Sequence, residues 1–147
     1  MVVIRPLFDS DRAEWLRLRQ ALWPGYNRLA LEQEMVDIVA RPETGAVFVA
    51  ERPEGGPCGL IEVSIRDRAE GCRSHNVGYI EGWYVDVDSR RVRVGRALVR
   101  AAEDWARAHG CSEMGSDTDS DYPISPAAHA ALGYQEVRRY IHFRKDL

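Results

Sequence analysis

The sequence predicts an α/β protein with a mixed central sheet and helices on both faces, in three layers. Short apolar runs rich in strand-forming residues alternate along the chain with segments whose apolar residues recur at the helical period. In addition, one long apolar run at 77–87 is followed closely by a helical pattern over 94–109. Such an order is typical of strands covered by helices.

The first half of the chain predicts one strand, two helices and a hairpin. Helical periodicity indicates each helix, Asp9 or Ser10 caps the first one, and the turn sequence Arg-Pro-Glu-Gly-Gly-Pro indicates the hairpin. The sequence Trp-Pro-Gly-Tyr separates the two helices. In chain order we expect a strand at 2–7, a helix that begins after Asp9 or Ser10, a helix over 29–39, and strands at 46–50 and 58–65.

The second half predicts a long strand, a long helix and three short elements. The long helix carries an apolar face and a charged face, and Gly110 ends it. In chain order we expect a loop at 67–76, a strand at 77–87, a helix at 94–109, a strand at 112–116, a helix at 124–132 and a final strand at 134–144.

Bulk properties favour one domain, 1–147, because the chain has ordinary length and no repeat or linker. The net charge of −3 argues against nucleic acid or an anionic membrane as the main partner. Cys58, Cys72 and Cys111 are odd in number and lack C-x-x-C spacing, so we expect neither disulfides nor zinc. No apolar leader and no apolar run of about 20 residues occurs. We therefore expect a cytoplasmic protein.

A cluster of arginines surrounds the start of the helix predicted at 94–109, namely Arg90, Arg91, Arg93 and Arg96. A helix N-terminus carries partial positive charge and N–H groups without partners, so it favours acidic residues. A bound phosphate would satisfy both the arginines and the N–H groups. The alternative is a basic turn in contact with solvent. Neither a Walker motif nor a dinucleotide glycine motif occurs here.

The stretch VDVDSRRVRVGRALVRAAEDWA, residues 85–106, resembles the coenzyme A-binding motif of the GNAT N-acetyltransferases. The segments LRQALWPG, YIEGWYVDVDS and GCSEMGSDT resemble one branch of that family, the aminoglycoside 6'-N-acetyltransferases, and the resemblance covers nearly the whole chain. It implies a GNAT fold with a central sheet of about six to seven strands, and acetyl-CoA as co-substrate with no metal. It also implies a homodimer, and an antibiotic-resistance activity on the 6'-amine of aminoglycosides.

The resemblance places the acetyl-CoA site on the end of the long strand and on the loop that opens the following helix. The family pattern Arg/Gln-x-x-Gly-x-Gly/Ala falls on Arg90, Arg93 and Gly95, and backbone N–H groups of that loop hold the pyrophosphate in the family. The implied cofactor contacts are Trp83, Tyr84, Val85, Arg90, Arg91, Val92, Arg93, Val94, Gly95, Arg96 and Tyr122.

Several positions depart from the family pattern. Arg93 replaces the first glycine of the cofactor motif, so we expect its side chain to turn away and its backbone to avoid positive φ. The loop after Ser-Ile-Arg is short and lacks the tyrosine that lines the substrate site in the family. Tyr122 replaces an asparagine, and Arg138 falls on an acid that contacts the drug. The changes in the loop and at Arg138 concern the range of acceptors. Arg93 and Tyr122 fall where the family contacts the cofactor, and Arg93 supports the alternative of coenzyme A binding without turnover.

Carboxylates are the expected attraction for a polyamine sugar. Glu81 lies within the apolar run Val-Gly-Tyr-Ile-Glu-Gly-Trp-Tyr-Val, where an unpaired buried acid is costly. Asp117 and Asp119 alternate in an extended segment and would face the same way. Alternatively, Glu81 pairs with an arginine such as Arg66, and the aspartates form a solvated loop. The resemblance adds Trp23, Glu81, Asp117, Asp119 and Glu136 as substrate contacts.

For catalysis, Glu81 is the candidate base, because an ammonium group must lose a proton before it attacks. By resemblance, the backbone N–H near Val85 stabilises the developing oxyanion. His129 falls where the family often has a tyrosine that protonates the departing thiolate, and a purely structural role for it is the alternative. Two other functions stay open. One is acetylation of a polyamine, lysine or protein N-terminus, and the other is coenzyme A binding without turnover.

Overall fold

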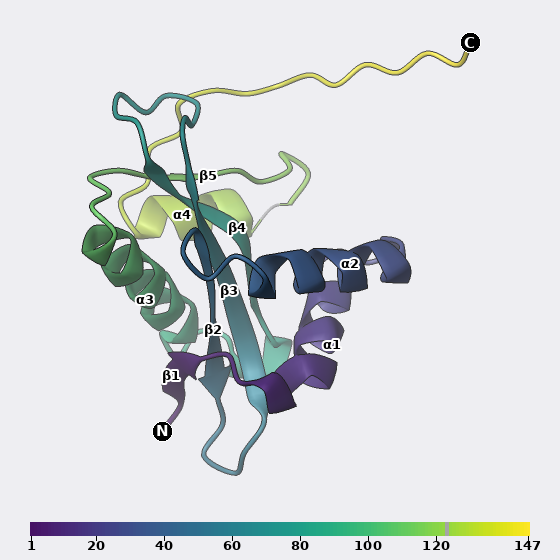
Figure 1. Cartoon of the computed structure of the whole chain (residues 1–147), viewed down its shortest axis with the longest axis vertical. Coiled ribbons are helices and arrows are strands. Elements are labelled where there is room, and N and C mark those ends of the chain that lie inside the picture. Colours follow the sequence, from purple (N-terminus) through teal and green to yellow (C-terminus); the bar gives the residue numbers. More distant parts are fainter. Residues whose placement is uncertain (123) are drawn as a thin grey trace.

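The computed structural model describes residues 1–122 and 124–147, and within these residues helices cover both faces of a mixed sheet (Figure 1). Neighbouring strands follow the order β1-β2-β3-β4-β5, and each pair is antiparallel except β4 and β5, which are parallel. The strands are β1 (Val3–Pro6), β2 (Gly45–Glu51), β3 (Pro57–Arg66), β4 (Val77–Val85) and β5 (Met114–Ser116). The helices are α1 (Arg12–Leu22), α2 (Arg28–Val39), α3 (Val94–Ala108) and α4 (Ser125–Ala131), with short 3-10 turns η1 (Asp9–Asp11) and η2 (Val87–Ser89).

The sheet separates two apolar cores, which confirms the three predicted layers. On one face α3 packs through residues such as Leu98 against Ile61 and its neighbours. On the other face α1 and α2 pack through residues such as Trp15 against Leu60. Leu60 and Ile61 are adjacent on β3 and point to opposite faces, because side chains alternate along a strand. Both faces of β3 are therefore buried.

The strand predicted at 134–144 is wrong, and the described sheet has five strands rather than six to seven. Residues 134–147 carry no regular secondary structure, and the end of this segment runs away from the sheet in Figure 1. Ile141 is 79% exposed and Phe143 is 91% exposed. The pattern has strand character, but a strand also needs a neighbouring edge with which to pair. The long strand predicted at 77–87 ends at Val85, because the 3-10 turn η2 begins at Val87.

No helix among the residues that the structure describes is long and apolar enough to cross a membrane.

Candidate active site

A β-bulge on β4 places the side chain of Glu81. The register pairs Glu62 with Gly82 and Val63 with Ile80, so Glu81 is the extra residue of its strand. A bulge of this kind redirects a side chain and locally bends the strand. Glu81 lines a cleft of about 570 Å³ formed by the end of α1, by α2 and by strands β2 to β4. The bulge explains how an acid inside an apolar strand reaches solvent.

The carboxylate of Glu81 is bonded to two side chains of β3. Ser64 donates its hydroxyl hydrogen bond to Oε2 at 2.5 Å. Arg66 donates from Nε to Oε2 at 2.9 Å and from Nη2 to Oε1 at 2.6 Å. The hydrogen bond to Glu81 raises the pKa of Arg66 above its ordinary value. The pairing of Glu81 with Arg66, considered above as an alternative to a functional role, is therefore present.

Asp117 is linked to Glu81 through two intervening side chains. The hydroxyl of Tyr79 donates a short hydrogen bond to Asp117, and the guanidinium of Arg66 lies 3.6 Å from the centre of the Tyr79 ring. Burial, and then the hydrogen bond to Asp117, raise the pKa of Tyr79. The fold thus brings together two of the four acids that the sequence analysis expects to contact substrate.

Asp119 and Glu136 lie in different surroundings. Asp119 is exposed, and its Oδ1 accepts a hydrogen bond from the backbone N–H of Asp121 at 3.0 Å, within its own turn. Glu136 is exposed on the C-terminal segment and forms an ion pair with Arg139. Neither residue is among the described residues that line the cleft of Glu81.

Trp23 lies at the end of α1 and forms one wall of the cleft. A Cβ atom built at Gly82 would lie 2.9 Å from Cη2 of the indole, so β4 passes directly beneath the ring. The guanidinium of Arg19 lies 4.9 Å from the ring centre. Tyr122 reaches the same helix end, where its hydroxyl donates to the carbonyl of Leu22 at 3.3 Å.

The described part of β4 separates from β5 just beyond Ile80. The parallel pairing covers only three residues of each strand and ends where Ile80 pairs with Ser116, whereas β4 continues to Val85. Trp83 lies in this stretch, and its indole N–H is buried without a hydrogen-bond partner among the described residues. A Cβ atom at Gly95 would lie 3.1 Å from the Trp83 ring. Gly95 therefore lets the first turn of α3 approach the separated strand.

The loop before α3 adopts left-handed backbone conformations that glycine usually occupies. Arg91 has φ of 68° and Arg93 has φ of 67°. The expectation that Arg93 avoids positive φ is wrong. Arg93 is the N-cap of α3, and the tight entry into the helix requires the left-handed conformation there. The backbone therefore keeps a glycine-like shape at Arg93 while the arginine bears the steric cost. Val92, between the two arginines, is 66% exposed, whereas Val94 is buried.

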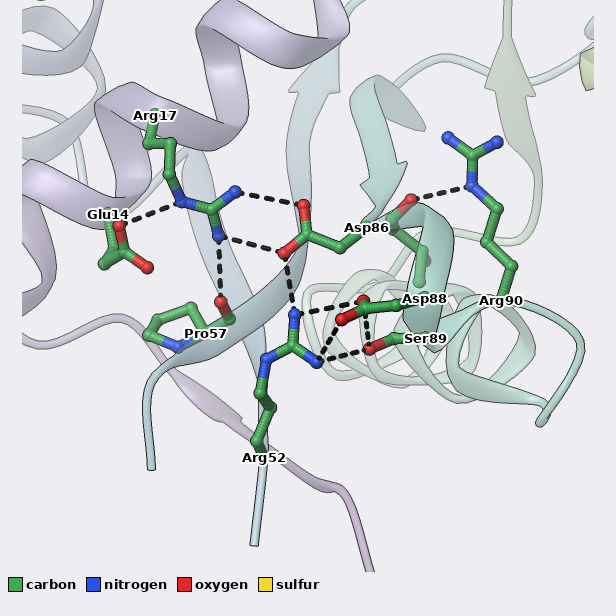
Figure 2. Close-up of polar contacts among 9 residues, drawn as sticks. Glu14, Arg17, Arg52, Pro57, Asp86, Asp88, Ser89 and Arg90 are labelled. Carbon is green, nitrogen blue, oxygen red and sulfur yellow. Dashed lines mark hydrogen bonds and ion pairs between the residues drawn. The ribbon is translucent and has the colours of Figure 1, made fainter. Parts of the chain in front are cut away.

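An ionic network anchors the start of this loop to the rest of the protein. Asp86 accepts hydrogen bonds from Arg17 of α1 and from Arg52 in the turn between β2 and β3 (Figure 2). Arg52 also contacts Asp88 and Ser89 of η2. Two separate segments are thereby tied to the residues that lead into the loop.

The side chains of Arg90 and Arg96 each donate a hydrogen bond to a backbone carbonyl group. Arg90 donates from Nε to the carbonyl of Val85 at 2.8 Å (Figure 2). Its guanidinium lies 5.5 Å from the centre of the Tyr84 ring. Arg96 donates from Nη2 to the carbonyl of Ala131 at 3.4 Å. Arg90 therefore stabilises the end of β4, from which the candidate oxyanion donor Val85 projects.

His129 connects α4 to β5 and to β4. Its Nδ1 lies 2.8 Å from the carbonyl of Ser125, so that nitrogen carries the hydrogen, and Nε2 accepts from the hydroxyl of Ser116 at 2.8 Å. The ring stands edge-on to Trp83 with a centroid distance of 5.4 Å. His129 thus lies beside the separated strands, with Ser116 as its polar neighbour.

Sequence reasoning missed Ser64 and Tyr79, and considered Arg66 only as a structural partner. A signal was available, because Ser64 and Arg66 alternate at the end of one strand while Tyr79 and Glu81 alternate at the start of the next. Alternate residues of adjacent strands share one face of a sheet. Hairpin pairing then brings the four polar side chains together, as the register of Ser64 with Tyr79 shows.

Two adjoining features therefore define the class of this protein. One strand carries a carboxylate in an acid-lined cleft, and its separated end leads into a helix N-terminus able to hold a phosphate. This is the layout of an acyltransferase that uses a coenzyme A thioester. A family model described as "Acetyltransferase (GNAT) family" matches residues 12–134, and the chain belongs to that family.

Relatives that match over nearly the whole chain are aminoglycoside acetyltransferases. The chain is 44% identical to an aminoglycoside N(6')-acetyltransferase type 1 from Klebsiella aerogenes, over 99% of this chain and 97% of the relative. It is 39% identical to the enzyme of the same name from Stenotrophomonas maltophilia, over 98% of this chain and 93% of the relative.

Solved structures agree with these relatives. AAC(6')-Iy in complex with the bisubstrate analog CoA-S-monomethyl-acetylneamine has a TM-score of 0.90 and 33% identity, and the alignment covers 100% of this chain and 99% of that chain. AAC(6')-Ih from Acinetobacter baumannii has a TM-score of 0.88 and 32% identity, with the same coverage.

Proposed function

We propose that this protein transfers the acetyl group of acetyl-CoA to the 6'-amino group of aminoglycoside antibiotics and so confers resistance to them. The observation that carries the proposal is the position of Glu81, on the bulge of the strand whose far end leads into the loop before α3. An acceptor amine at Glu81 and a thioester along the same strand would meet without any change of fold. Full-length relatives at 32–44% identity carry this activity in their names.

The residues present suit acetyl-CoA, which when bound supplies an activated acetyl thioester. The glycine-like backbone at Arg91 and Arg93 and the unpaired N–H groups in the first turn of α3 suit a pyrophosphate. We assign these contacts to Arg90, Arg91, Val92, Arg93, Val94, Gly95 and Arg96. The separated end of β4 offers Trp83, Tyr84 and Val85 to the pantetheine arm, and we assign Tyr122 to the same site.

In this proposal Glu81 accepts the proton that the substrate ammonium loses, through a water molecule. The nitrogen lone pair then forms the new C–N bond at the thioester carbon while the C–S bond breaks and its electron pair leaves on sulfur. The nitrogen gives up its surplus proton to water as the amide forms. The backbone N–H of Val85 donates to the carbonyl oxygen as negative charge develops there. Trp23, Asp117, Asp119 and Glu136 contribute to acceptor binding.

We assign the protonation of the thiolate to His129 acting with Ser116. The hydroxyl of Ser116 donates to Nε2 of His129 and lies at the last paired residue of β5, beside the separation of the strands. A hydroxyl in that position can pass a proton to the sulfur when the imidazole is protonated on both nitrogens, because Nε2–H then replaces the proton that the hydroxyl gives up. The thiolate is a fair leaving group at neutral pH, so this step contributes less than the base does.

Two aminoglycosides that differ at one group test the activity. Neomycin has a 6'-amine, whereas paromomycin has a hydroxyl in its place. We expect acetyl-CoA to release free thiol with neomycin and not with paromomycin, and mass spectrometry to find one added acetyl group. Equal thiol release with both compounds would place the acetyl group elsewhere, and release with spermidine alone would favour a polyamine acetyltransferase.

We also propose that the protein is a homodimer. The C-terminal segment supports this, because Tyr140, Ile141 and Phe143 are more than half exposed and would be covered by a second copy. Light scattering from the purified protein tests it. The proposal fails if the mass corresponds to one chain at micromolar concentration.

A further inference from the structure

Arg66 forms a two-pronged ion pair with Glu81 that is open to solvent. The two contacts measure 2.6 Å and 2.9 Å, and the side chains are 44% and 32% exposed. Exposed ion pairs are weak, at about 0.2–1 kcal/mol. A cation from solution can therefore exchange with the guanidinium at small cost.

Arg66 also lies between the two acids that would attract a substrate amine. Its guanidinium contacts Glu81 on one side and stacks over Tyr79 on the other, and Tyr79 donates its hydroxyl hydrogen bond to Asp117. The position on Glu81 that a substrate ammonium needs is thus already held by a positive charge from the protein.

The surroundings allow Arg66 to leave without disturbing Glu81. Ser64 holds Oε2 of Glu81 independently, at 2.5 Å. Arg66 is the last residue of β3 and its backbone pairs with Val77, so the side chain can turn outward while the strand stays paired. The carboxylate then remains oriented and becomes available to another cation.

We propose that Arg66 is a resident counter-cation of Glu81, that an ammonium group of the acceptor displaces it, and that Arg66 thereby sets the affinity for polycationic amines. This role rests on the proposed function, since it requires an aminoglycoside ammonium at Glu81. If Arg66 and Glu81 formed a purely structural pair, Arg66 would have no influence on the affinity for amines.

Calorimetric titration of neomycin into the protein without acetyl-CoA tests the role directly. Arg66→Met removes the charge and keeps an apolar side chain over Tyr79. We expect the dissociation constant for neomycin to fall about two- to fivefold at low salt, in line with the strength of an exposed pair. Arg66→Lys keeps the charge and should bind close to wild type. In a Glu81→Gln background, Arg66→Met should bring no gain.

An unchanged or larger dissociation constant in Arg66→Met overturns the proposal, as does an equal gain in the Glu81→Gln background. If Arg66→Met fails to fold by circular dichroism, Arg66→Gln replaces it in the same titration. Thiol release by the wild type separates this failure from that of the proposed function. If the wild type releases thiol with neomycin but Arg66→Met binds neomycin no more tightly, only the role of Arg66 is refuted. If the wild type neither binds neomycin nor releases thiol, both the role of Arg66 and the proposed function are refuted.

Discussion

Arg19 and Glu62 form a two-pronged ion pair inside the protein, with contacts of 2.8 Å and 3.1 Å and only 3% of each side chain exposed. Glu62 also accepts from the indole N–H of Trp15 at 2.8 Å, and Arg19 donates to the carbonyl of Leu31 at 2.9 Å. The pair thus joins α1, α2 and β3 beneath the cleft. Each buried charge is satisfied by the other and by a neutral partner, and Arg19 also pairs with Glu34 at 2.9 Å. This satisfaction is the condition for burying both charges.

We expect Glu62→Ala to lower the free energy of unfolding by about 3 kcal/mol, the lower end for breaking a buried pair, because the buried Arg19 keeps only the more exposed Glu34 and the carbonyl of Leu31 as partners. Urea denaturation measures the change. Glu32→Ala is the matched control, since Glu32 pairs with Arg28 on the surface of α2 and should cost less than about 1 kcal/mol. The double variant Arg19→Met, Glu62→Leu should lose less than Glu62→Ala alone. Similar losses in Glu62→Ala and Glu32→Ala would show that the buried pair is unimportant.

Arg93→Gly should preserve coenzyme A affinity and leave stability unchanged or slightly higher. A left-handed conformation costs a non-glycine residue about 1–2 kcal/mol. Glycine removes that cost but loses about 0.5–1 kcal/mol through the greater freedom of the unfolded chain. Calorimetric titration with coenzyme A and thermal unfolding measure the two effects.

Arg93→Ala is the control for that experiment, because it removes the guanidinium but keeps a side chain at φ of 67°. Backbone recognition of phosphate predicts that both variants bind coenzyme A within about threefold of wild type, the range of a weak exposed charge contact. A tenfold loss in both variants would show that the Arg93 side chain itself holds phosphate.

The sequence predicts much of this fold because its signals are local. The apolar face of 94–109 and the turn sequence Arg-Pro-Glu-Gly-Gly-Pro depend only on neighbouring residues. The segment at 134–144 shows the limit. Its residues have strand character, yet pairing depends on an edge that other parts of the molecule must supply. The left-handed backbone conformations of Arg91 and Arg93 could not be predicted either, because local preference disfavours them and the fold imposes them.

The candidate site could likewise be predicted only in part from the sequence. Glu81 is conspicuous because an acid interrupts an apolar run, whereas the bulge that turns it into the cleft depends on the register between β3 and β4. Arg66 could be named as a partner of Glu81, but its stacking on Tyr79 follows only from side-chain positions. The buried pair of Arg19 and Glu62 had no signal in either helix or strand alone.

Glu81→Gln should reduce catalytic efficiency with neomycin by about 10²–10⁴-fold, the contribution of a general base. The protein should stay folded, because the side chain is partly exposed and its ion pair is weak. Steady-state kinetics and thermal unfolding measure both quantities. Glu54→Gln, in the exposed turn after β2, is the control and should be unchanged. A catalytic efficiency within about threefold of wild type would refute the assignment of Glu81, because loss of a general base costs far more.

Asp11 should contribute to stability at neutral pH and not in strong acid. Its hydrogen bonds with Arg5, at 2.7 Å and 3.0 Å, lower the pKa of the carboxyl below its ordinary value. The folded protein therefore binds this proton more weakly than the unfolded chain does. The stabilisation is complete above the ordinary aspartate pKa and disappears as pH falls through the lowered value.

Asp11→Asn tests this dependence by urea denaturation at several pH values. The wild type should be more stable than the variant by about 2 kcal/mol at pH 7, the scale of a hydrogen bond to a charged group. The difference should shrink below the ordinary pKa of aspartate, about 3.9. A difference that stays constant from pH 7 down to pH 2 would assign the effect to shape rather than charge.

Gly82→Ala should weaken acceptor binding by moving Trp23. The added methyl group would lie 2.9 Å from Cη2 of the indole and 3.2 Å from Leu22, so the ring has to shift. Loss of an aromatic contact predicts an increase of about five- to tenfold in KM for neomycin, with KM for acetyl-CoA unchanged. Gly45→Ala, in the same cleft, is the matched control, because its nearest contact would be an ordinary 3.5 Å. If the effect passes through Trp23, adding Gly82→Ala to Trp23→Ala should change nothing further. Additive losses in that double variant would mean that Gly82 acts on the substrate by another route.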